Sequence, residues 1–196
     1  MNRPSFRIAV AGTHSTGKTT FLTQMKDLFK QRGLAVAYVH DSAINARDKG
    51  FPILADHTFE STAWLMARAI ELETEATISA DVILVDRPVA DALGYLHAAL
   101  LHTSRSITAA RIRALEGICE AWCPEYDLVF LTVLDPSVEL GEGRDGDVLF
   151  RARAAKEVTR VVDRFMADRH LLRHGETDAA LAFAIAAFDN HRCEAS

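Results

Sequence analysis

An eight-residue segment near the N-terminus constrains the fold more than any other feature of the sequence. Residues 12–19 read Gly-Thr-His-Ser-Thr-Gly-Lys-Thr and match the pattern G-x-x-x-x-G-K-[ST] in full. A nearly unbroken apolar run, Phe6 to Ala11, precedes the segment, and an amphipathic stretch, Gly17 to Arg32, follows it. A buried strand, a tight turn and a helix in this order are typical of a parallel sheet that helices cover on both faces.

The chemistry of this segment predicts that it binds the phosphates of ATP. The two glycines allow a tight turn that directs successive backbone N–H groups toward an anion. The positive N-terminal end of the following helix points at the same anion. Lys18 would reach the β- and γ-phosphates, and the Thr19 hydroxyl would ligate Mg²⁺. The predicted cofactor-binding residues are Gly12, Thr13, His14, Ser15, Thr16, Gly17, Lys18, Thr19 and Thr20.

Short β-rich runs alternate with amphipathic helices along the rest of the chain, which indicates a parallel α/β sheet. The further predicted strands are 35–40, 82–85, 128–134 and 170–173; the predicted helices are 17–32, 58–79, 89–101, 107–122, 148–166 and 176–188. Residues 42–57 are irregular, with Gly50 and Pro52, and are predicted to form a loop. A chain of 196 residues without a long linker fits a single domain, 1–196.

The third predicted strand ends in a carboxylate, Asp86, which is followed by Arg87. An aspartate at this position can hold Mg²⁺ through water and fix the metal against the phosphates. The alternative is that Asp86 caps the helix that starts near Val89. Arg87 lies at the edge of the sheet where ligands bind in such folds, and its guanidinium would clamp a phosphate or the acceptor.

Asp91 and Tyr95 are four residues apart on the next helix and therefore share one face. Leu93, Leu96 and Leu100 form a different, apolar face of the same helix. We expect Asp91 and Tyr95 to look toward a polar cleft; the alternative is an exposed pair on a solvated face.

Together, the phosphate loop, a carboxylate at the end of the second strand and the pattern Asp86-Arg87-Pro88-x-x-Asp91-x-x-x-Tyr95 resemble the P-loop nucleoside and nucleotide kinases. The resemblance is to the nicotinamide riboside kinase-like ATPase domains and to deoxynucleoside and thymidylate kinases, and it extends to about Arg169. It implies a three-layer α/β/α sandwich with a five-stranded parallel sheet in the order 2-3-1-4-5.

The resemblance also implies a mobile, arginine-rich lid, here residues 141–153. Three glycines in this segment would give the flexibility that a closing segment needs. Arg144, Arg151 and Arg153 would stabilise charge on the transferring phosphoryl group. The alternative is a solvent loop that precedes a charged helix.

A kinase that phosphorylates a hydroxyl benefits from a carboxylate that accepts its proton. In the resembled kinases this group ends the second strand, and Asp41 occupies the matching place. His40 is the competitor, because its side chain titrates near neutrality. The alternative for Asp41 is the N-cap of a short helix through residues 43–47.

The predicted helix 58–79 would form a wall of the acceptor pocket through Trp64 and Arg68, although a tryptophan in a helix is more often packing. The predicted catalytic residues are Lys18, Asp41, Arg87, Arg144 and Arg151. The predicted substrate-binding residues are Asp41, Trp64, Arg68, Arg87, Asp91 and Tyr95. Thr19 and Asp86 are the predicted metal ligands.

These residues favour an ATP-dependent kinase that transfers the γ-phosphoryl group to a nucleoside-like hydroxyl. Two alternatives stay open: a nucleoside monophosphate kinase in which Arg87 holds the acceptor phosphate, and a nucleotide-dependent regulatory ATPase or switch. A GTPase is disfavoured, because the chain has no Asn-Lys-x-Asp element.

Composition narrows the class of partner. A net charge of -5 argues against broad nucleic-acid binding, and no apolar run approaches the roughly 18 to 20 residues that span a bilayer. Three cysteines and the absence of an apolar signal segment predict a cytoplasmic protein. The expected partner is therefore a small-molecule acceptor, and no association with a membrane is expected. A homodimer stays an open alternative.

Overall fold

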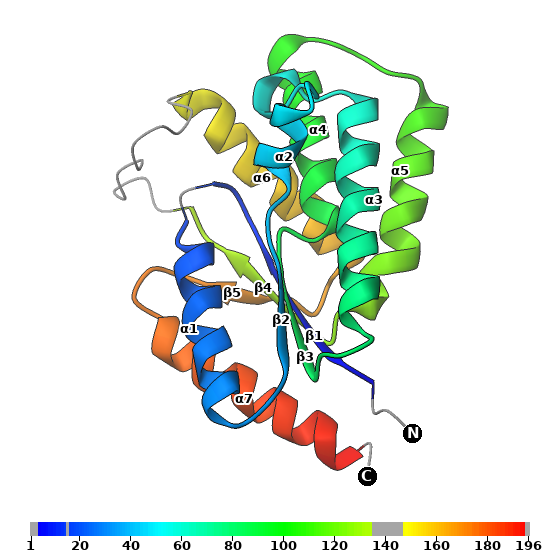
Figure 1. Ribbon diagram of the computed structural model, residues 1–196. Helices are drawn as coiled ribbons and strands as arrows, with labels where there is room; N and C mark the ends of the chain where they lie inside the picture. The colour runs from blue at the N-terminus through cyan, green and yellow to red at the C-terminus, as the bar shows by residue number, and fades with distance from the viewer. Residues whose placement is uncertain (1–3, 15, 135–146, 195–196) are drawn as a thin grey trace.

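The computed structural model describes residues 4–14, 16–134 and 147–194, and its centre is a five-stranded sheet (Figure 1). The strands are β1 (Phe6–Ala11), β2 (Val36–Val39), β3 (Val82–Asp86), β4 (Leu128–Thr132) and β5 (His170–Leu172). All pairs are parallel, and the order is β2-β3-β1-β4-β5. The predicted parallel sheet and its order are thus confirmed.

Helices cover both faces of the sheet, which makes a three-layer α/β/α sandwich. One face carries α1 (Lys18–Gln31) and α7 (Thr177–Glu194); the other carries α3 (Phe59–Ala76), α4 (Val89–Thr103), α5 (Ala109–Trp122) and α6 (Val148–Phe165). Alternation along β1 explains the two cores, because successive side chains of a strand point to opposite faces. Phe6, Ile8 and Val10 pack toward α1 and α7, while Ala9 and Ala11 pack toward α3, α4 and α6.

The register of the strands places the candidate residues at one edge of the sheet. Val10 lies beside Asp86, and Val39 lies beside Val85. In parallel strands the carboxyl ends meet at the same edge, where ligands bind in open α/β sheets. The segments that follow β1, β2 and β3 therefore converge on this edge.

The prediction of a loop over residues 42–57 is wrong in part, and the alternative of a short helix through residues 43–47 is close to the structure. The segment contains α2 (Ala43–Asp48) and a 3₁₀ turn, η1 (Leu54–Asp56). The Asp41 side chain accepts a 2.8 Å hydrogen bond from the Ala43 N–H and so satisfies one of the unpaired amides at the start of α2. Further along, Thr58 and Ser61 form a reciprocal capping box that starts α3.

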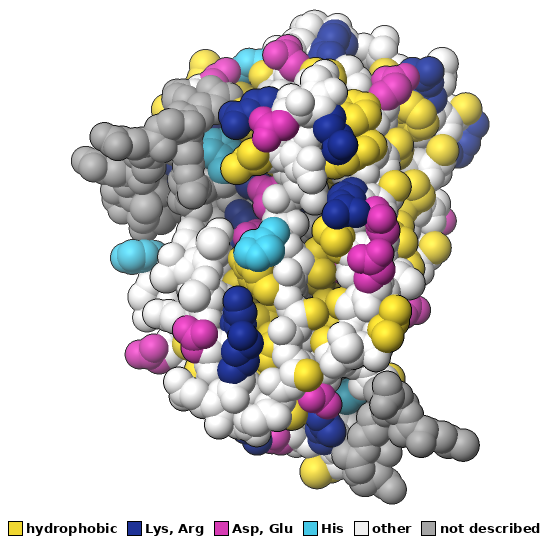
Figure 2. Space-filling model, in the orientation of Figure 1, with side chains coloured by type: hydrophobic (Ala, Val, Ile, Leu, Met, Phe, Trp, Pro, Cys, Tyr) yellow, Lys and Arg dark blue, Asp and Glu magenta, His cyan; other side chains and the backbone are white. Residues whose placement is uncertain are grey.

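None of the helices in the described part of the chain has the length and apolar character that a membrane crossing requires. On the face shown in Figure 2, basic and acidic side chains of the described residues are interspersed, and apolar side chains lie between them. Charge on this face is therefore mixed and does not gather into one basic strip.

Candidate active site

The turn after β1 has the backbone shape that its glycines predict. Gly12 has φ 133° and Gly17 has φ 83°, both in the region that side chains disfavour. A Cβ atom on Gly12 would lie 2.0 Å from Thr132 Oγ1, so only glycine fits beside β4. The Lys18 ammonium folds back over the turn and donates a hydrogen bond to the Thr13 carbonyl. Ser15 lies outside the described residues.

Helix α4 holds this turn through two backbone amides. The Gly12 N–H donates to Asp91 Oδ2 at 3.1 Å, and the His14 N–H donates to the Tyr95 hydroxyl at 3.1 Å. Both side chains are buried, with exposed fractions of 1% for Asp91 and 4% for Tyr95. Their burial excludes an exposed pair on a solvated face, and both line the cavity described below, while their role in substrate binding stays a prediction.

Two predicted metal ligands lie together at the start of α1 and the end of β3. The Thr19 hydroxyl donates to Asp86 Oδ2 at 3.2 Å, and the Tyr38 hydroxyl from β2 donates to the same oxygen at 3.1 Å. A hydroxyl and a carboxylate oxygen fit Mg²⁺, which usually binds one or two carboxylates plus substrate phosphates and water. Among the described residues, no group of three or more His, Cys, Asp or Glu side chains could hold a metal.

Asp41 and Arg87 form an ion pair between the ends of β2 and β3. Arg87 Nε donates to Asp41 Oδ2 at 2.6 Å, and Arg87 Nη1 donates to the Gly12 carbonyl at 3.3 Å. The guanidinium also lies 4.9 Å from the centre of the Tyr95 ring, in a cation–π contact. Arg87 has φ 72°, a strained conformation for a residue other than glycine. The role of Asp41 as proton acceptor stays a prediction. Its carboxylate bonds to Arg87 and to the first amide of α2, although the N-cap of that helix is Ser42.

Burial sets the protonation of these groups. Burial raises the pKa of Asp41, but Arg87, the Ala43 amide and Lys18 outweigh it, so the pKa lies below its usual value. The Asp41 carboxyl is therefore ionised at neutral pH.

Burial also raises the pKa of Asp91, and the positive charge of Arg87 opposes this rise. Burial lowers the pKa of Lys18, and the charge of Arg87 lowers it further.

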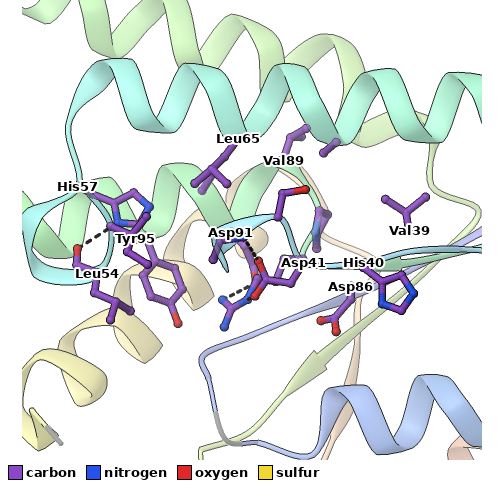
Figure 3. Close-up of a pocket in the computed structure, with 17 residues that line it drawn as sticks. Val39, His40, Asp41, Leu54, His57, Leu65, Asp86, Val89, Asp91 and Tyr95 are labelled. Carbon is purple, nitrogen blue, oxygen red and sulfur yellow. Dashed lines mark hydrogen bonds and ion pairs between the residues drawn. The ribbon is translucent and has the colours of Figure 1, made fainter. Parts of the chain in front are cut away.

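A cavity adjoins this cluster, with an empty volume of about 610 Å³ that includes open solvent (Figure 3). It lies between the ends of β2 and β3, α2, η1, α3 and α4. Its apolar wall includes Val39, Ile53, Leu54, Leu65, Ala69 and Val89. Four predicted substrate-binding residues line it, namely Asp41, Arg87, Asp91 and Tyr95. An apolar cavity with a few convergent polar groups is the usual form of a small-molecule site.

The two other predicted substrate-binding residues do not line this cavity. The Trp64 ring stacks on Phe51, with 5.3 Å between the ring centroids. Arg68 pairs with Glu71 at 2.7 Å and lines a separate groove beside β2. The structure thus places Trp64 and Arg68 in surface and packing contacts outside the cavity.

Of the predicted lid, residues 141–153, the structure describes only the C-terminal part, residues 147–153. Residues 141–146, including Arg144, lie outside the described residues. Arg151 lies in the first turn of α6, is 6% exposed, and its Nε donates to the His14 carbonyl at 3.3 Å. Arg153, two residues later, is exposed. Of these arginines, Arg151 is the one that the described structure brings to the phosphate loop.

Two residues at the site were missed by sequence reasoning. Tyr38 contacts Asp86, and His57 lines the cavity beside Tyr95. Tyr38 lies within a strand, where alternation alone could not tell a site residue from a packing one. His57 lies at the end of a short irregular segment and belongs to no recognised sequence motif. The sequence therefore carried no signal that it lies at the site.

Comparisons with solved structures agree with this fold. NadR in complex with NR superposes with a TM-score of 0.63 at 14% identity over 86% of this chain, which spans about 45% of the length of that protein. Thymidylate kinase from Ehrlichia chaffeensis has a TM-score of 0.63 at 12% identity, covering 94% of this chain and 98% of that one. Deoxyadenosine kinase from M. mycoides, with bound dATP, has a TM-score of 0.61 at 11% identity, covering 94% and 100%.

A search of curated proteins by sequence found no match. A family model described as an AAA domain matches residues 7–178, which is most of the chain. Together with the strand order, the phosphate loop and the structural neighbours, this match shows that the chain belongs to the AAA-domain family and has a P-loop nucleoside and nucleotide kinase-like fold.

Proposed function

We propose that this protein is an ATP-dependent kinase that transfers the γ-phosphoryl group to a hydroxyl of a small nucleoside-like acceptor. One observation carries the proposal: the ionised Asp41 faces a largely apolar cavity and is tied to the phosphate loop by a single side chain. Arg87 bonds to Asp41 on one side and to the Gly12 carbonyl on the other. A proton acceptor and a phosphate site are thus held side by side.

On the nucleotide side, the amides of the turn and Lys18 would hold the β- and γ-phosphates of ATP. Thr19 and Asp86 would hold Mg²⁺, which when bound neutralises charge on the phosphate oxygens. The buried Lys18 ammonium loses water on folding, which makes its attraction to a polyphosphate stronger than in solution. Arg151 lies at the same turn and is positioned to contact charge that develops on the transferred group.

On the acceptor side, Asp41 would take the proton of the hydroxyl as its oxygen bonds to the γ-phosphorus. The bond from that phosphorus to the β–γ bridging oxygen breaks at the same time, and ADP leaves. Arg87 orients the carboxylate, and the Ala43 amide fixes its second oxygen. Each carboxylate oxygen has a further lone pair to receive the hydroxyl hydrogen.

The charge of the cavity favours a nucleoside over a nucleoside monophosphate. Its lining includes the carboxyl groups of Asp41, Asp86 and Asp91, and Arg87 is the arginine among them. The Arg87 guanidinium already bonds to Asp41 and the Gly12 carbonyl and lies 3.7 Å from Asp91. A phosphate on the acceptor would have to compete with these carboxylates for one cation, which costs free energy.

The names of the structural neighbours support a nucleoside-like acceptor, but they include both nucleoside and nucleoside monophosphate kinases and so do not separate the two. They are a complex of NadR with NR, thymidylate kinases and a deoxyadenosine kinase. At 11–14% identity these neighbours bear on the fold, and the acceptor of this chain is inferred from the cavity.

Incubation with ATP, Mg²⁺ and a panel of nucleosides and nucleoside monophosphates tests the proposal. We expect ADP formation that depends on a nucleoside, with a phosphorylated product detected by mass spectrometry. Lys18→Ala is the matched control and should abolish transfer. Phosphorylation of monophosphates alone would favour the monophosphate kinase, and ATP turnover without any acceptor would favour a regulatory ATPase.

A further inference from the structure

His57 lies at the junction between η1 and α3 and lines the acceptor cavity with only 4% of its surface exposed. Its Nδ1 lies 3.0 Å from the Leu54 carbonyl oxygen, as the dashed line in Figure 3 marks. A carbonyl oxygen can only accept a hydrogen bond, so Nδ1 carries the hydrogen. The neutral ring therefore has a lone pair at Nε2, which makes no hydrogen bond with any residue that the structure describes.

The imidazole stays neutral at physiological pH. Burial lowers the pKa of His57 to about 4, against a smaller opposing effect of the Leu54 carbonyl. The nearby Arg87 guanidinium lowers the pKa further. Nε2 is therefore a hydrogen-bond acceptor and not a donor throughout the range in which enzymes usually work.

The backbone around His57 is held independently of its ring. Arg105 Nη2 donates to the Ala55 carbonyl at 2.9 Å and to the His57 carbonyl at 3.1 Å. On the other side, the capping box of α3 begins at Thr58. Leu54, whose carbonyl orients the ring, has φ 58°, a conformation that residues other than glycine rarely adopt. A ring positioned this firmly can discriminate between ligands, because little freedom is lost when it binds.

Along the lining of the cavity, His57 lies apart from Asp86, the predicted metal ligand. Figure 3 shows His57 and Tyr95 at one end, Asp86 at the other, and Asp41 between them. The His57 and Tyr95 rings are 5.7 Å apart, and Leu54 and Leu65 add apolar surface at this end. A molecule whose hydroxyl lies at Asp41 would place its far end, a flat ring, against these groups.

We propose that His57 selects the acceptor: its Nε2 accepts a hydrogen bond from an amino group on the ring at the end of the acceptor that is remote from the transferred phosphoryl group. This inference rests on the proposed function and deepens it, because it names the class of acceptor. A ring with an amino group satisfies the lone pair of Nε2. A ring with hydrogen in place of the amino group would cover Nε2 and leave it unpaired, which reduces binding.

The competing explanation is that the imidazole serves only to hold Leu54 in its turn. Two variants separate the roles. Asparagine at position 57 can place its amide nitrogen near Nδ1 and keep the bond to Leu54, but nothing then reaches the place of Nε2. Glutamine can place its amide oxygen near Nε2 and keep the acceptor, while the bond to Leu54 is lost.

The experiment measures kcat/KM of each protein for matched pairs of nucleosides: adenosine against purine riboside, and cytidine against its analogue with hydrogen at position 4. In the wild type we expect the amino-bearing member of the accepted pair to be preferred about tenfold or more, mainly through KM. His57→Asn should reduce this preference to about one, and His57→Gln should keep most of it. Circular dichroism and ADP binding establish that both variants are folded.

Transfer to nucleosides with equal kcat/KM within each pair, or a preference that His57→Asn leaves intact, would overturn the role of His57 and leave the kinase proposal standing. Loss of the preference in His57→Gln with retention in His57→Asn would assign the ring to the Leu54 turn and overturn it equally. If no nucleoside is phosphorylated at all, the proposed function fails first, and this inference fails with it.

Discussion

The Nε atom of Arg87 donates a 2.6 Å hydrogen bond to Oδ2 of Asp41, and this bond joins the ends of two adjacent strands, β2 and β3. The side chains of Arg87 and Asp41 are 17% and 32% exposed, so water screens the pair only in part. The pair keeps the carboxylate ionised and aims it at the cavity. Its strength therefore controls the group that we propose as the proton acceptor.

Removal of this arginine should change the pH dependence of transfer. In the wild type the pKa of Asp41 lies below its usual value, so activity that needs the ionised carboxylate is lost only at strongly acidic pH. In Arg87→Gln the effect of burial remains and raises the pKa. The acid limb of the kcat/KM profile should move to higher pH by about one to three units.

Arg32→Gln, which removes a surface arginine paired with Asp189, is the control and should leave the acid limb in place. An unshifted acid limb in a folded Arg87→Gln protein would mean that Asp41 does not govern the rate.

Asp41→Asn should lower turnover by roughly 10² or more while nucleotide binding stays largely intact. The amide oxygen can still accept the Ala43 N–H, so α2 should keep its start. It cannot take a proton from the acceptor hydroxyl. Steady-state kinetics together with ADP titration check the two halves of this prediction, and wild-type turnover would pass the base role to His40 or to no residue.

Tyr38→Phe should weaken metal binding in the nucleotide complex by roughly 10- to 100-fold, which is the usual effect of removing a partner of a metal-ligating carboxylate. The Tyr38 hydroxyl donates to Asp86 Oδ2, and its loss would let the carboxylate turn. Electron paramagnetic resonance of Mn²⁺ with ADP measures the affinity. Tyr126→Phe removes a hydroxyl that bonds to Glu73 instead and should leave the metal affinity unchanged.

Glu73 should make the protein less stable as pH rises toward 7. Burial raises the pKa of Glu73 to about 7, although Trp122 Nε1 donates to it at 2.8 Å and the Tyr126 hydroxyl at 3.0 Å. Between about pH 4.5 and 7 the folded state binds the proton that the unfolded state has released. The stabilising contribution is present below this window and is lost as pH rises through it.

Glu73→Gln removes the titration and keeps hydrogen-bonding groups in place. From pH 5 to pH 8 the wild type should lose about 2–3 kcal/mol of unfolding free energy relative to this variant. Urea denaturation at both pH values measures the difference, and parallel pH profiles of the two proteins would contradict the prediction.

Gly94→Ala should destabilise the protein by about 1–3 kcal/mol, although alanine favours helices. A Cβ atom on Gly94 in α4 would lie 2.6 Å from the Val158 Cα of α6, so the two helices would have to separate. Gly117→Ala in α5 is the matched control, because no atom lies within 4 Å of its added Cβ. Thermal unfolding should show a lower melting temperature for the first variant and an equal or higher one for the second.

Much of the fold could be predicted from the sequence because its signals are local. Apolar runs mark the buried strands, and the glycine pattern marks the turn after β1, whose φ values require glycine. The inward face of Asp91 and Tyr95 followed from helical periodicity alone. The strand order came from the family resemblance, since no local pattern encodes which strands pair.

The remaining features depend on contacts between distant parts of the chain. Helix α2 begins where the Asp41 side chain accepts a hydrogen bond from the Ala43 amide, and the sequence offered this helix only as an alternative to a loop. The turn that carries His57 is held by Arg105, which is 48 residues away. Trp64 was a predicted wall residue of the cavity, but its ring stacks on Phe51 instead. Contacts between residues that are far apart in the chain decide these features, and a single sequence does not tell which distant residues make contact.

The Asp91 carboxylate and the Tyr95 hydroxyl receive two amide hydrogens of the turn after β1. The conformational entropy of that stretch is therefore given up when the chain folds and not when an anion arrives. The affinity for the anion then depends on the packing of α4 against the rest of the protein. A change between α4 and α6, remote from every group that would touch the anion, should weaken its binding.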